Sequence, residues 1–315
     1  MAGDAVIREL RQEDAAAVAR LELEIVPDQV LTPEVVWQRA SRQVEREQLR
    51  TWVAELDGEV VAYAHASFEW SMPTPGKGRF WIGVVPRARE RGIGSALYEQ
   101  ALEHLRSHGA WRARTWVDAD PAGTRFVERR GFEPLEVDRV SALELGGAEI
   151  PEPTVPEGFG VVPLGEARDR KQDLYEICAA GELDMPGEEP ETELSFEDWL
   201  QDDYGSPALT DEGSFVVLSG ERVVALAFLT VDPERRLAYN QMTATLPEFR
   251  RRGLALAVKL AAARWAAANG YERIVTENNA DNEGMLAVNG RVGYRPLYDQ
   301  VGWLRQWERP PGERG

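Results

Sequence analysis

The residues best suited to chemistry in this chain form a short basic motif with glycine, and the motif occurs twice. RERGIG at positions 89–94 recurs as RRRGLA at positions 250–255. Small residues let a backbone approach a ligand closely, and guanidinium groups bind phosphate oxygens. The first N–H groups of a helix lack intrahelical partners and suit an anion. The motif therefore predicts two phosphate-binding loops, with a solvated basic helix start as the alternative.

The elements around the motif are expected to present it in the same way in both copies. Each copy follows a strand pattern that ends in proline, at Pro86 and Pro247, and opens a long alanine-rich helical pattern, at 91–108 and 252–269. A strand, a turn and a helix in this order expose the first N–H groups of the helix. Cations at a helix start oppose the helix dipole, which favours the anion-binding interpretation.

Further matches between the two halves indicate domain duplication. DGE at 57–59 matches SGE at 219–221, and GF at 131–132 matches GY at 293–294, each at an offset of 162. This period is far longer than the ~20–50 residues of a solenoid repeat. A chain of 315 residues suits two domains of about 150 residues each. We predict an N-terminal domain at 1–146, a linker rich in Pro, Gly and Glu at 147–158, and a C-terminal domain at 159–315.

Both halves show the same order of expected elements. The order is strand, helix, β-hairpin, strand, long helix, strand, helix and strand, with Asp57-Gly58 as the strongest hairpin signal. We therefore expect an α/β fold of the α+β mixed-sheet kind, in which each of two tandem domains is a twisted mixed sheet flanked by helices.

Composition restricts the partners and the compartment. The net charge of −18 opposes nonspecific binding to nucleic acid and suits a cationic partner, or solubility alone. No apolar run reaches the length of a membrane span, no signal peptide is recognisable, and Cys178 is the single cysteine. We expect a cytoplasmic monomer or homodimer that binds neither nucleic acid nor membrane, and no metal site.

The order of elements, with Arg-x-x-Gly-x-Gly/Ala after a proline-ended strand and a later Gly-Phe or Gly-Tyr, resembles the GNAT family of acetyl-CoA-dependent N-acetyltransferases. The resemblance covers nearly the whole chain, twice. Mycothiol synthase is an architectural parallel, although nothing in the sequence identifies its substrate. The resemblance implies that acetyl-CoA is the co-substrate and that backbone N–H groups of the repeated loops cradle the pyrophosphate of coenzyme A.

The same resemblance suggests which residues hold coenzyme A. An asparagine-bearing turn with Asn278 and Asn282 follows the fifth strand of the second half, where GNAT proteins hold the pantetheine arm; Asn282 is equally suited to cap the next helix. The first half has Asp118 and Asp120 there instead. The expected cofactor-binding residues are Val84, Val85, Arg89, Arg91, Gly92, Ile93, Gly94, Thr245, Arg250, Arg251, Arg252, Gly253, Leu254, Ala255, Asn278 and Asn282.

The usual general acid of the family, a tyrosine in the helix before the Gly-aromatic pair, is missing from both halves. Val127 and Asn289 stand in its place, and neither side chain is an acid at neutral pH. Attack of an amine on a thioester needs a deprotonated amine, a polarised carbonyl and a proton for the thiolate. We expect Thr243, Asn289 and Tyr294 to lie nearest the reacting atoms. Either water or another side chain takes the role of the tyrosine, or the protein does not catalyse the reaction.

The second half is the better equipped for an acceptor. Segment 181–204 is rich in Asp and Glu and has no Lys or Arg. In GNAT proteins this region walls the acceptor site, so Glu182 and Asp184 are expected to bind a cationic amine; an ordinary acidic surface loop is the alternative. Gln241 is expected to contact the substrate from a strand face that looks into the acetyl site, or to belong to a polar strand face under a loop. Gln241, Thr243 and Thr245 alternate along one strand and are expected to share a face.

These features predict an N-acetyltransferase that moves an acetyl group from acetyl-CoA to a primary amine, a small cationic acceptor, by direct attack in the C-terminal domain. The N-terminal domain is then structural or cofactor-holding. The alternatives are a catalytically silent acyl-CoA-binding or regulatory protein, and an enzyme that acetylates a protein amine.

Overall fold

The computed structural model describes residues 5–42, 44–69, 76–118, 120–187 and 195–308. The chain forms two compact units. Unit 1 consists of Met1–Glu136 with Gln300–Gly315, and unit 2 consists of Val137–Asp299. Within the described residues, no helix is long and apolar enough to cross a bilayer, and no group of three His, Cys, Asp or Glu side chains is placed to hold a metal ion.

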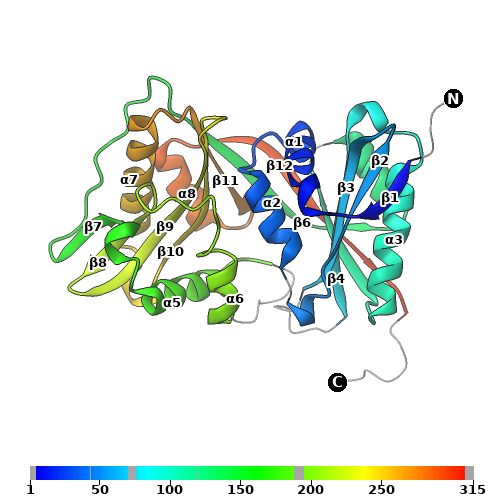
Figure 1. Ribbon diagram of the computed structural model, residues 1–315. Coiled ribbons are helices and arrows are strands. Elements are labelled where there is room, and N and C mark those ends of the chain that lie inside the picture. The colour runs from blue at the N-terminus through cyan, green and yellow to red at the C-terminus, as the bar shows by residue number, and fades with distance from the viewer. Residues whose placement is uncertain (1–4, 43, 70–75, 119, 188–194, 309–315) are drawn as a thin grey trace. The chain divides into compact units, whose positions relative to one another are not determined.

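Unit 1 is a mixed sheet with helices on both faces. Its strand order is β1-β2-β3-β4-β5-β12, and only β4 and β5 run parallel. Helices α1 and α2 lie on one side of β2–β4, and α3 lies on the other (Figure 1). The elements are β1 (Val6–Glu9), α1 (Ala15–Ile25), α2 (Pro33–Ser41), β2 (Arg50–Leu56), β3 (Glu59–Phe68), β4 (Lys77–Val84), α3 (Ile93–Ser107), β5 (Arg112–Val117), α4 (Pro121–Glu128) and β12 (Arg295–Gln306).

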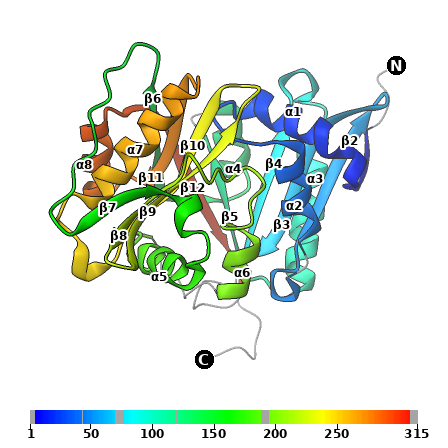
Figure 2. The same ribbon diagram turned by 60° about the vertical axis from the view of Figure 1, so that its left-hand side comes forward.

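Unit 2 repeats this architecture. Its strand order is β6-β11-β10-β9-β8-β7, and only β10 and β11 run parallel. Helices α5 and α7 lie on opposite sides of β8–β10 (Figure 2). The elements are β6 (Glu133–Glu144), β7 (Phe159–Pro163), α5 (Lys171–Glu182), α6 (Phe196–Gln201), β8 (Phe215–Ser219), β9 (Arg222–Asp232), β10 (Leu237–Thr245), α7 (Leu254–Ala268), β11 (Arg273–Asn279) and α8 (Glu283–Val292).

The compact units differ from the expected domains 1–146 and 159–315, because the two final strands are exchanged. The end of β12, from Val301 to Gln306, pairs with β5 of unit 1. The end of β6, from Asp138 to Glu144, pairs with β11 of unit 2. Each sheet is therefore completed by the last strand of the other sequence half, and the chain changes unit inside a strand rather than in the linker at 147–158.

Both predicted hairpins form. Asp57 and Gly58 have φ values of 53° and 82°, the left-handed turn that joins two antiparallel strands tightly. The pairs Leu56–Glu59 and Ser219–Arg222 close the two turns. Leu56, rather than Asp57, is thus the counterpart of Ser219.

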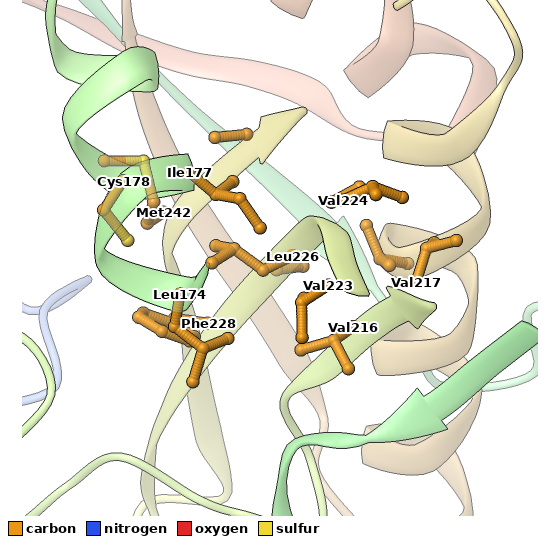
Figure 3. Close-up of a cluster of buried hydrophobic side chains, with 14 of the residues drawn as sticks. Leu174, Ile177, Cys178, Val216, Val217, Val223, Val224, Leu226, Phe228 and Met242 are labelled. Carbon is orange, nitrogen blue, oxygen red and sulfur yellow. The ribbon is translucent and has the colours of Figure 1, made fainter. Parts of the chain in front are cut away.

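The core of unit 2 fills the face of the sheet that lies under α5. Leu226, Phe228 and Met242 point from the sheet toward Ile177 and Cys178 of that helix (Figure 3). Residues spaced three and four apart lie on one face of a helix, so the apolar stripe of α5 is buried here. This packing fixes β9 and β10, which carry the candidate site.

Candidate active site

The two repeated loops have the same backbone geometry. Each contains a left-handed residue two positions before a left-handed glycine: Glu90 (φ 63°) with Gly92 (φ 83°), and Arg251 (φ 60°) with Gly253 (φ 81°). The first intrahelical hydrogen bonds run from Ala96 N to the Gly92 oxygen and from Ala257 N to the Gly253 oxygen, both 3.0 Å. The helix N–H groups before these bonds have no intrahelical partner, so both loops can face an anion.

The first arginine of each loop supports the loop from the side. Arg89 Nε donates to the Val84 carbonyl and Arg250 Nε to the Thr245 carbonyl, both at 3.0 Å. The remaining guanidinium atoms differ: Arg89 Nη1 lies 3.1 Å from Asp120 Oδ2, whereas Arg250 pairs with Asp184. The unit 1 carboxylate stands at the start of α4, where unit 2 has the neutral Asn282 at the start of α8. A carboxylate beside the loop repels phosphate, and each loop has one: Asp120 in unit 1 and the exposed Asp184 in unit 2.

The parallel strands next to each loop separate after three residue pairs. The last pair between β10 and β11 is Tyr239–Val275, and the last pair between β4 and β5 is Arg79–Arg114. In unit 2, Thr276 Oγ1 donates to the Asn240 carbonyl at 3.1 Å, at the point where the strands part. Beyond this point no residue pair joins β10 to β11 in the described part of the chain.

A β-bulge distinguishes β10 from β4. The register of β10 against β9 passes from Asn240–Leu229 to Met242–Phe228 and leaves Gln241 outside the ladder. The Asn240 side chain holds this geometry: its Nδ2 donates to the carbonyls of Phe228 (3.0 Å) and Met242 (3.1 Å). In contrast, β4 pairs with β3 without a register shift. A bulge leaves the extra residue outside the ladder, so Gln241 has no partner residue on β9.

A buried lysine completes the polar centre of unit 2. Lys259 of α7 is 3% exposed, and its Nζ donates to Asn240 Oδ1. Thr243 Oγ1 donates to the same oxygen at 3.0 Å, so the Asn240 amide makes four hydrogen bonds. The Nζ also lies 4.9 Å from the centre of the Tyr294 ring. Desolvation lowers the pKa of Lys259 to about 7.

Unit 1 has an aromatic cluster at the corresponding place. Strand pairing aligns Phe80, opposite Ala66, with Asn240, opposite Leu229. Phe80 contacts Tyr98 with ring centres 5.7 Å apart and Phe132 at the same separation. Tyr98 and Phe132 hold the positions of Lys259 and Tyr294 in the repeat. The polar, bulged centre is therefore a property of unit 2.

The asparagines expected near the pantetheine arm have definite partners. Asn282 Oδ1 accepts a hydrogen bond from Met285 N at 3.1 Å. Asn282 is therefore the N-terminal cap of α8, one of the two roles that its sequence position allowed. Asn289 is buried, and its Nδ2 donates to Asn278 Oδ1 at 2.6 Å. Asn289 Oδ1 and Thr245 Oγ1 are both sealed from water without a hydrogen-bond partner. Such orphaned polar atoms beside the strand separation can be satisfied by the amides of a ligand.

The three residues expected on one strand face have three environments, because the bulge interrupts the alternation of β10. Gln241 Nε2 donates to Asp203 Oδ1 at 2.6 Å, Thr243 joins the Asn240 network, and the Thr245 hydroxyl has no partner. Tyr294 is fully enclosed, and burial raises its pKa above the usual value, so it keeps its proton rather than releasing it.

The acidic segment reaches β10 through its last residues. Asp203, just after α6, binds Gln241, while Asp198 binds Ser195 at the start of α6. Asp184 is exposed and pairs with Arg250 of the loop, and Glu182 is half-buried at the end of α5. Glu188, Glu189, Glu191 and Glu193 lie outside the described residues.

Asn240 and Lys259 are the functional candidates that the sequence prediction missed. The signal for Lys259 was present: the pattern LALAVKLAAA at 254–263 is apolar all round, which is typical of a buried helix. A lysine inside such a helix must be buried and needs an acceptor. Nothing in the sequence identified Asn240 as that acceptor.

A comparison with models of protein families finds one family that matches the chain twice. The model of the acetyltransferase (GNAT) family matches residues 12–132 and again residues 172–294, which is well over half of the chain. The two matches contain the two loops and the strands that separate beside them.

Curated proteins match the chain over about three quarters of its length. The mycothiol acetyltransferase of Saccharomonospora viridis is 26% identical over 252 residues, which is 77% of this chain and 78% of that protein. The mycothiol acetyltransferase of Streptomyces bingchenggensis is 27% identical over 244 residues, 76% of this chain and 75% of that protein.

Two solved structures show the same fold across nearly the whole length. The tandem GNAT protein from the clavulanic acid biosynthesis pathway has a TM-score of 0.72 at 19% identity and covers 96% of this chain and 98% of its own. The GCN5-related N-acetyltransferase from Sphaerobacter thermophilus has a TM-score of 0.66 at 20% identity, and the match covers 96% of this chain and 95% of that protein. The chain therefore belongs to the GNAT family of acetyltransferases, as a tandem member and an acetyl-CoA-dependent N-acetyltransferase.

Proposed function

We propose that unit 2 transfers the acetyl group of acetyl-CoA to the primary amine of a small cationic molecule by direct attack. The amine nitrogen bonds to the thioester carbonyl carbon, the carbon–sulfur bond breaks, and coenzyme A leaves as a thiolate that takes up a proton. Unit 1 is a structural or cofactor-holding copy. The observation that carries the proposal is the bulged, open edge of β10 beside the Gly253 loop.

Each part of this edge supports one requirement of the reaction. The N–H groups that begin α7 suit the pyrophosphate, with Arg251 and Arg252 as nearby cations. The Gln241 N–H, outside the ladder, suits the thioester oxygen as charge develops on it. The unsatisfied atoms of Thr245 and Asn289 suit the amide groups of the pantetheine arm. Thr243 and Lys259 hold Asn240, and through it they hold the bulge.

The acceptor side of the proposal rests on charge. Asp203 meets Gln241 at the bulge, and the described part of segment 181–204 contains no cation. A carboxylate-rich wall attracts a cationic amine and orients it toward the thioester. The name of the curated relatives, mycothiol acetyltransferase, supports an acceptor of small-molecule size. A buried lone cysteine, Cys178, is consistent with a reducing compartment such as the cytoplasm.

The second candidate is an acyl-CoA-binding protein without turnover, and one observation favours it. Asn289 replaces the tyrosine that serves as general acid in the family, and it is held by Asn278. Tyr294 is enclosed with a raised pKa. Neither Asn289 nor Tyr294 is therefore suited to give a proton to the leaving thiolate.

Amine-dependent release of the coenzyme A thiol separates the two candidates. The intact chain is incubated with acetyl-CoA and a panel of polyamines, amino sugars, amino acids and mycothiol precursors, and acetylated products are identified by mass. The proposal expects one amine class to raise thiol release well above hydrolysis, on the scale of 1–10³ turnovers per second that is typical of enzymes. Tight binding of acetyl-CoA with no turnover on any amine, including a peptide α-amine and a lysine peptide, contradicts it.

A further inference from the structure

Unit 1 carries a cluster of aromatic and ionisable side chains that the acetyl-transfer proposal does not use. Tyr63 and His65 of β3 and Trp81 of β4 lie on the sheet, with ring centres 6.0 Å (Tyr63–His65), 6.2 Å (Tyr63–Trp81) and 6.5 Å (His65–Trp81) apart. The His65 and Trp81 rings are stacked at 16°. Glu22 of α1 interacts electrostatically with Tyr63. These four residues are called the Glu22 cluster below.

The Glu22 cluster replaces an apolar core at the same place in the repeat. The bonds from Val85 N to the Val61 oxygen and from Leu246 N to the Val224 oxygen align the two sheets. In the aligned registers, the pair Tyr63–Gly83 matches Leu226–Ala244, and the pair His65–Trp81 matches Phe228–Met242. All four counterparts in unit 2 belong to the apolar core under α5 (Figure 3).

The helix that covers this face also differs between the units: α1 of unit 1 has a carboxylate where α5 of unit 2 has a cysteine. A Cβ on Gly83 would lie 2.8 Å from Ile25 of α1, and a Cβ on Gly181 of α5 would lie 2.8 Å from Ala244. Ile25 and Gly181 are therefore equivalent, and Glu22 corresponds to Cys178, three residues earlier in each helix. Unit 1 thus keeps the packing frame of this face but fills it with a carboxylate, a phenol, an imidazole and an indole.

The polar atoms of the Glu22 cluster are unpaired yet reach solvent. Within the described part of the chain, no hydrogen bond or ion pair engages the Glu22 carboxylate, the Tyr63 hydroxyl or the His65 ring nitrogens, and none of these atoms is among those sealed from water. Glu22, His65 and Trp81 are each partly exposed. Desolvation raises the pKa of Glu22 to about 7 and lowers that of His65 to about 3. Groups enclosed on most sides but still wetted are suited to a small ligand.

We propose that the Glu22 cluster is a binding site of unit 1 for a small organic cation, an amine or a quaternary ammonium ion. A carboxylate without a close counter-ion and the faces of a tyrosine and a tryptophan are the groups that attract such a cation most strongly. The imidazole of His65, neutral here, adds an acceptor without repelling the ligand. The site lies in unit 1 and does not depend on the chemistry proposed for unit 2.

The charged groups that face Glu22 set the pH dependence. Arg39, exposed on α2, acts on Glu22, Tyr63 and His65, and Arg79 of β4 acts on His65 while its Nε donates to Ser67. Arg39 favours the ionised form of Glu22, and a bound cation favours it further. Cation binding therefore tightens as the pH rises through about 7 and releases a proton from Glu22.

Calorimetric titration of the intact chain with benzylamine and with tetramethylammonium tests the site, with benzyl alcohol and benzoate as matched neutral and anionic probes. The proposal expects saturable binding of the two cations alone, weakened about tenfold for each pH unit below 7, as for a ligand that needs the ionised carboxylate. Glu22→Gln is expected to weaken cation binding at pH 8 by about tenfold or more. Glu24→Gln, an exposed position on the same helix, is the control and leaves binding unchanged.

A second variant replaces part of the cluster with its counterparts from the other unit, so that a folding defect of one variant does not leave the site untested. Tyr63→Leu with His65→Phe reproduces the pair found in unit 2 and is expected to abolish cation binding. Cation binding that is unchanged in both Glu22 and Tyr63/His65 variants, or equal binding of benzyl alcohol, overturns the proposal. Gly253→Trp separates it from the acetyl-transfer proposal, because that variant is expected to lose turnover and keep this cation site.

Discussion

The Asn240 amide connects three elements of unit 2, α7, β9 and β10, at a single side chain. It accepts hydrogen bonds from Lys259 of α7 and from Thr243, and donates to carbonyls of β9 and β10. Among the described residues, Asn240 Oδ1 is the one hydrogen-bond acceptor of the Lys259 ammonium, and a buried ammonium with so few acceptors is costly to keep desolvated. We therefore expect a well-packed apolar residue at position 259 to make the protein more stable, while removing the hydrogen bond to Asn240 that supports the bulge.

Lys259→Met should reveal this cost as a pH effect. Below pH 7 the lysine is charged in the folded and the unfolded chain, and the full desolvation cost is present. Between about 7 and the ordinary pKa of 10.5 the folded chain has lost a proton that the unfolded chain still binds, so the free energy of unfolding rises with pH. We expect the free energy of unfolding of the variant to exceed that of the wild type at pH 6 by on the order of 3 kcal/mol. This difference should become smaller toward pH 10.

Chemical denaturation of the wild type and of Lys259→Met at pH 6, 8 and 9.5 measures this difference. Lys171→Met serves as the control, because Lys171 is exposed at the start of α5. Parallel pH profiles for the wild type and Lys259→Met would show that the lysine titrates normally and is not desolvated.

Asp120 is expected to limit coenzyme A binding by unit 1. Its Oδ2 lies 3.1 Å from Arg89 and adds a negative charge beside the loop. Asp120→Asn keeps a helix cap and removes that charge, so we expect coenzyme A to bind unit 1 about tenfold more tightly. Titration in a Gly253→Trp background isolates unit 1, and Glu103→Gln, exposed on α3, controls for net charge. No gain in affinity would mean that Asp120 does not face the phosphate.

At the scale of elements, unit 2 differs from unit 1 by one extra residue in a strand. The bulge between Asn240 and Met242 leaves Gln241 outside the ladder, where we propose that its N–H meets the thioester oxygen. In unit 1, β4 continues in regular register with a buried Phe80. Conversion of the polar pair to its unit 1 counterpart, Asn240→Phe with Lys259→Tyr, should keep an apolar contact of the kind seen in unit 1. We expect turnover to fall by about 10²-fold or more, as when an oxyanion donor is lost.

Coenzyme A affinity distinguishes this outcome from a folding defect. The loop at Arg250–Ala255 is unchanged in the double variant, so coenzyme A should bind within a few-fold of the wild type. Phe80→Leu in unit 1 is the matched control for the loss of one core contact. Full turnover by the double variant would show that catalysis does not depend on the bulge.

The sequence predicted the elements and loops well, and the bulge not at all. Hairpins, loop motifs and long helices have local signals: Asp57-Gly58, the left-handed Gly92 and Gly253, and alanine-rich repeats. A polar residue in a strand has no such meaning by itself, because the same Asn240 fits an exposed face, a bulge or a strand end. Its role follows only from Lys259, which lies on a different element, the helix α7.

At the scale of the whole molecule, neither sequence half contains a complete sheet. Unit 1 needs β12 beside β5, and unit 2 needs β6 beside β11. This exchange could not be predicted, because an antiparallel strand shows the same alternation whichever neighbour it pairs with. The duplication and the two-unit organisation were predictable from the nearly constant offset between the repeated motifs, while the membership of the last strands was not.

The exchange predicts that the halves depend on each other. A fragment of residues 1–146 leaves the β5 edge from Arg112 to Val117 without its antiparallel partner, and an unpaired edge promotes aggregation. We expect 1–146 and 159–315 to be insoluble or poorly folded when made separately, and soluble as a complex when co-expressed. Circular dichroism and size-exclusion chromatography of the fragments measure this. A monomeric, cooperatively folded fragment 1–146 would contradict the exchange.

The most direct test of the central claim, that unit 2 is the acetyl-transferring unit, compares Gly253→Trp with Gly92→Trp. Both glycines are left-handed (φ 81° and 83°) with no atom within 4 Å of an added Cβ, so the substitutions impose similar backbone strain and differ in the loop that they block. Amine-dependent release of the coenzyme A thiol is measured for both variants and the wild type. We expect Gly253→Trp to lower turnover at least about 10²-fold and Gly92→Trp to stay within a few-fold of the wild type. Loss of turnover in Gly92→Trp with activity retained in Gly253→Trp would contradict the claim.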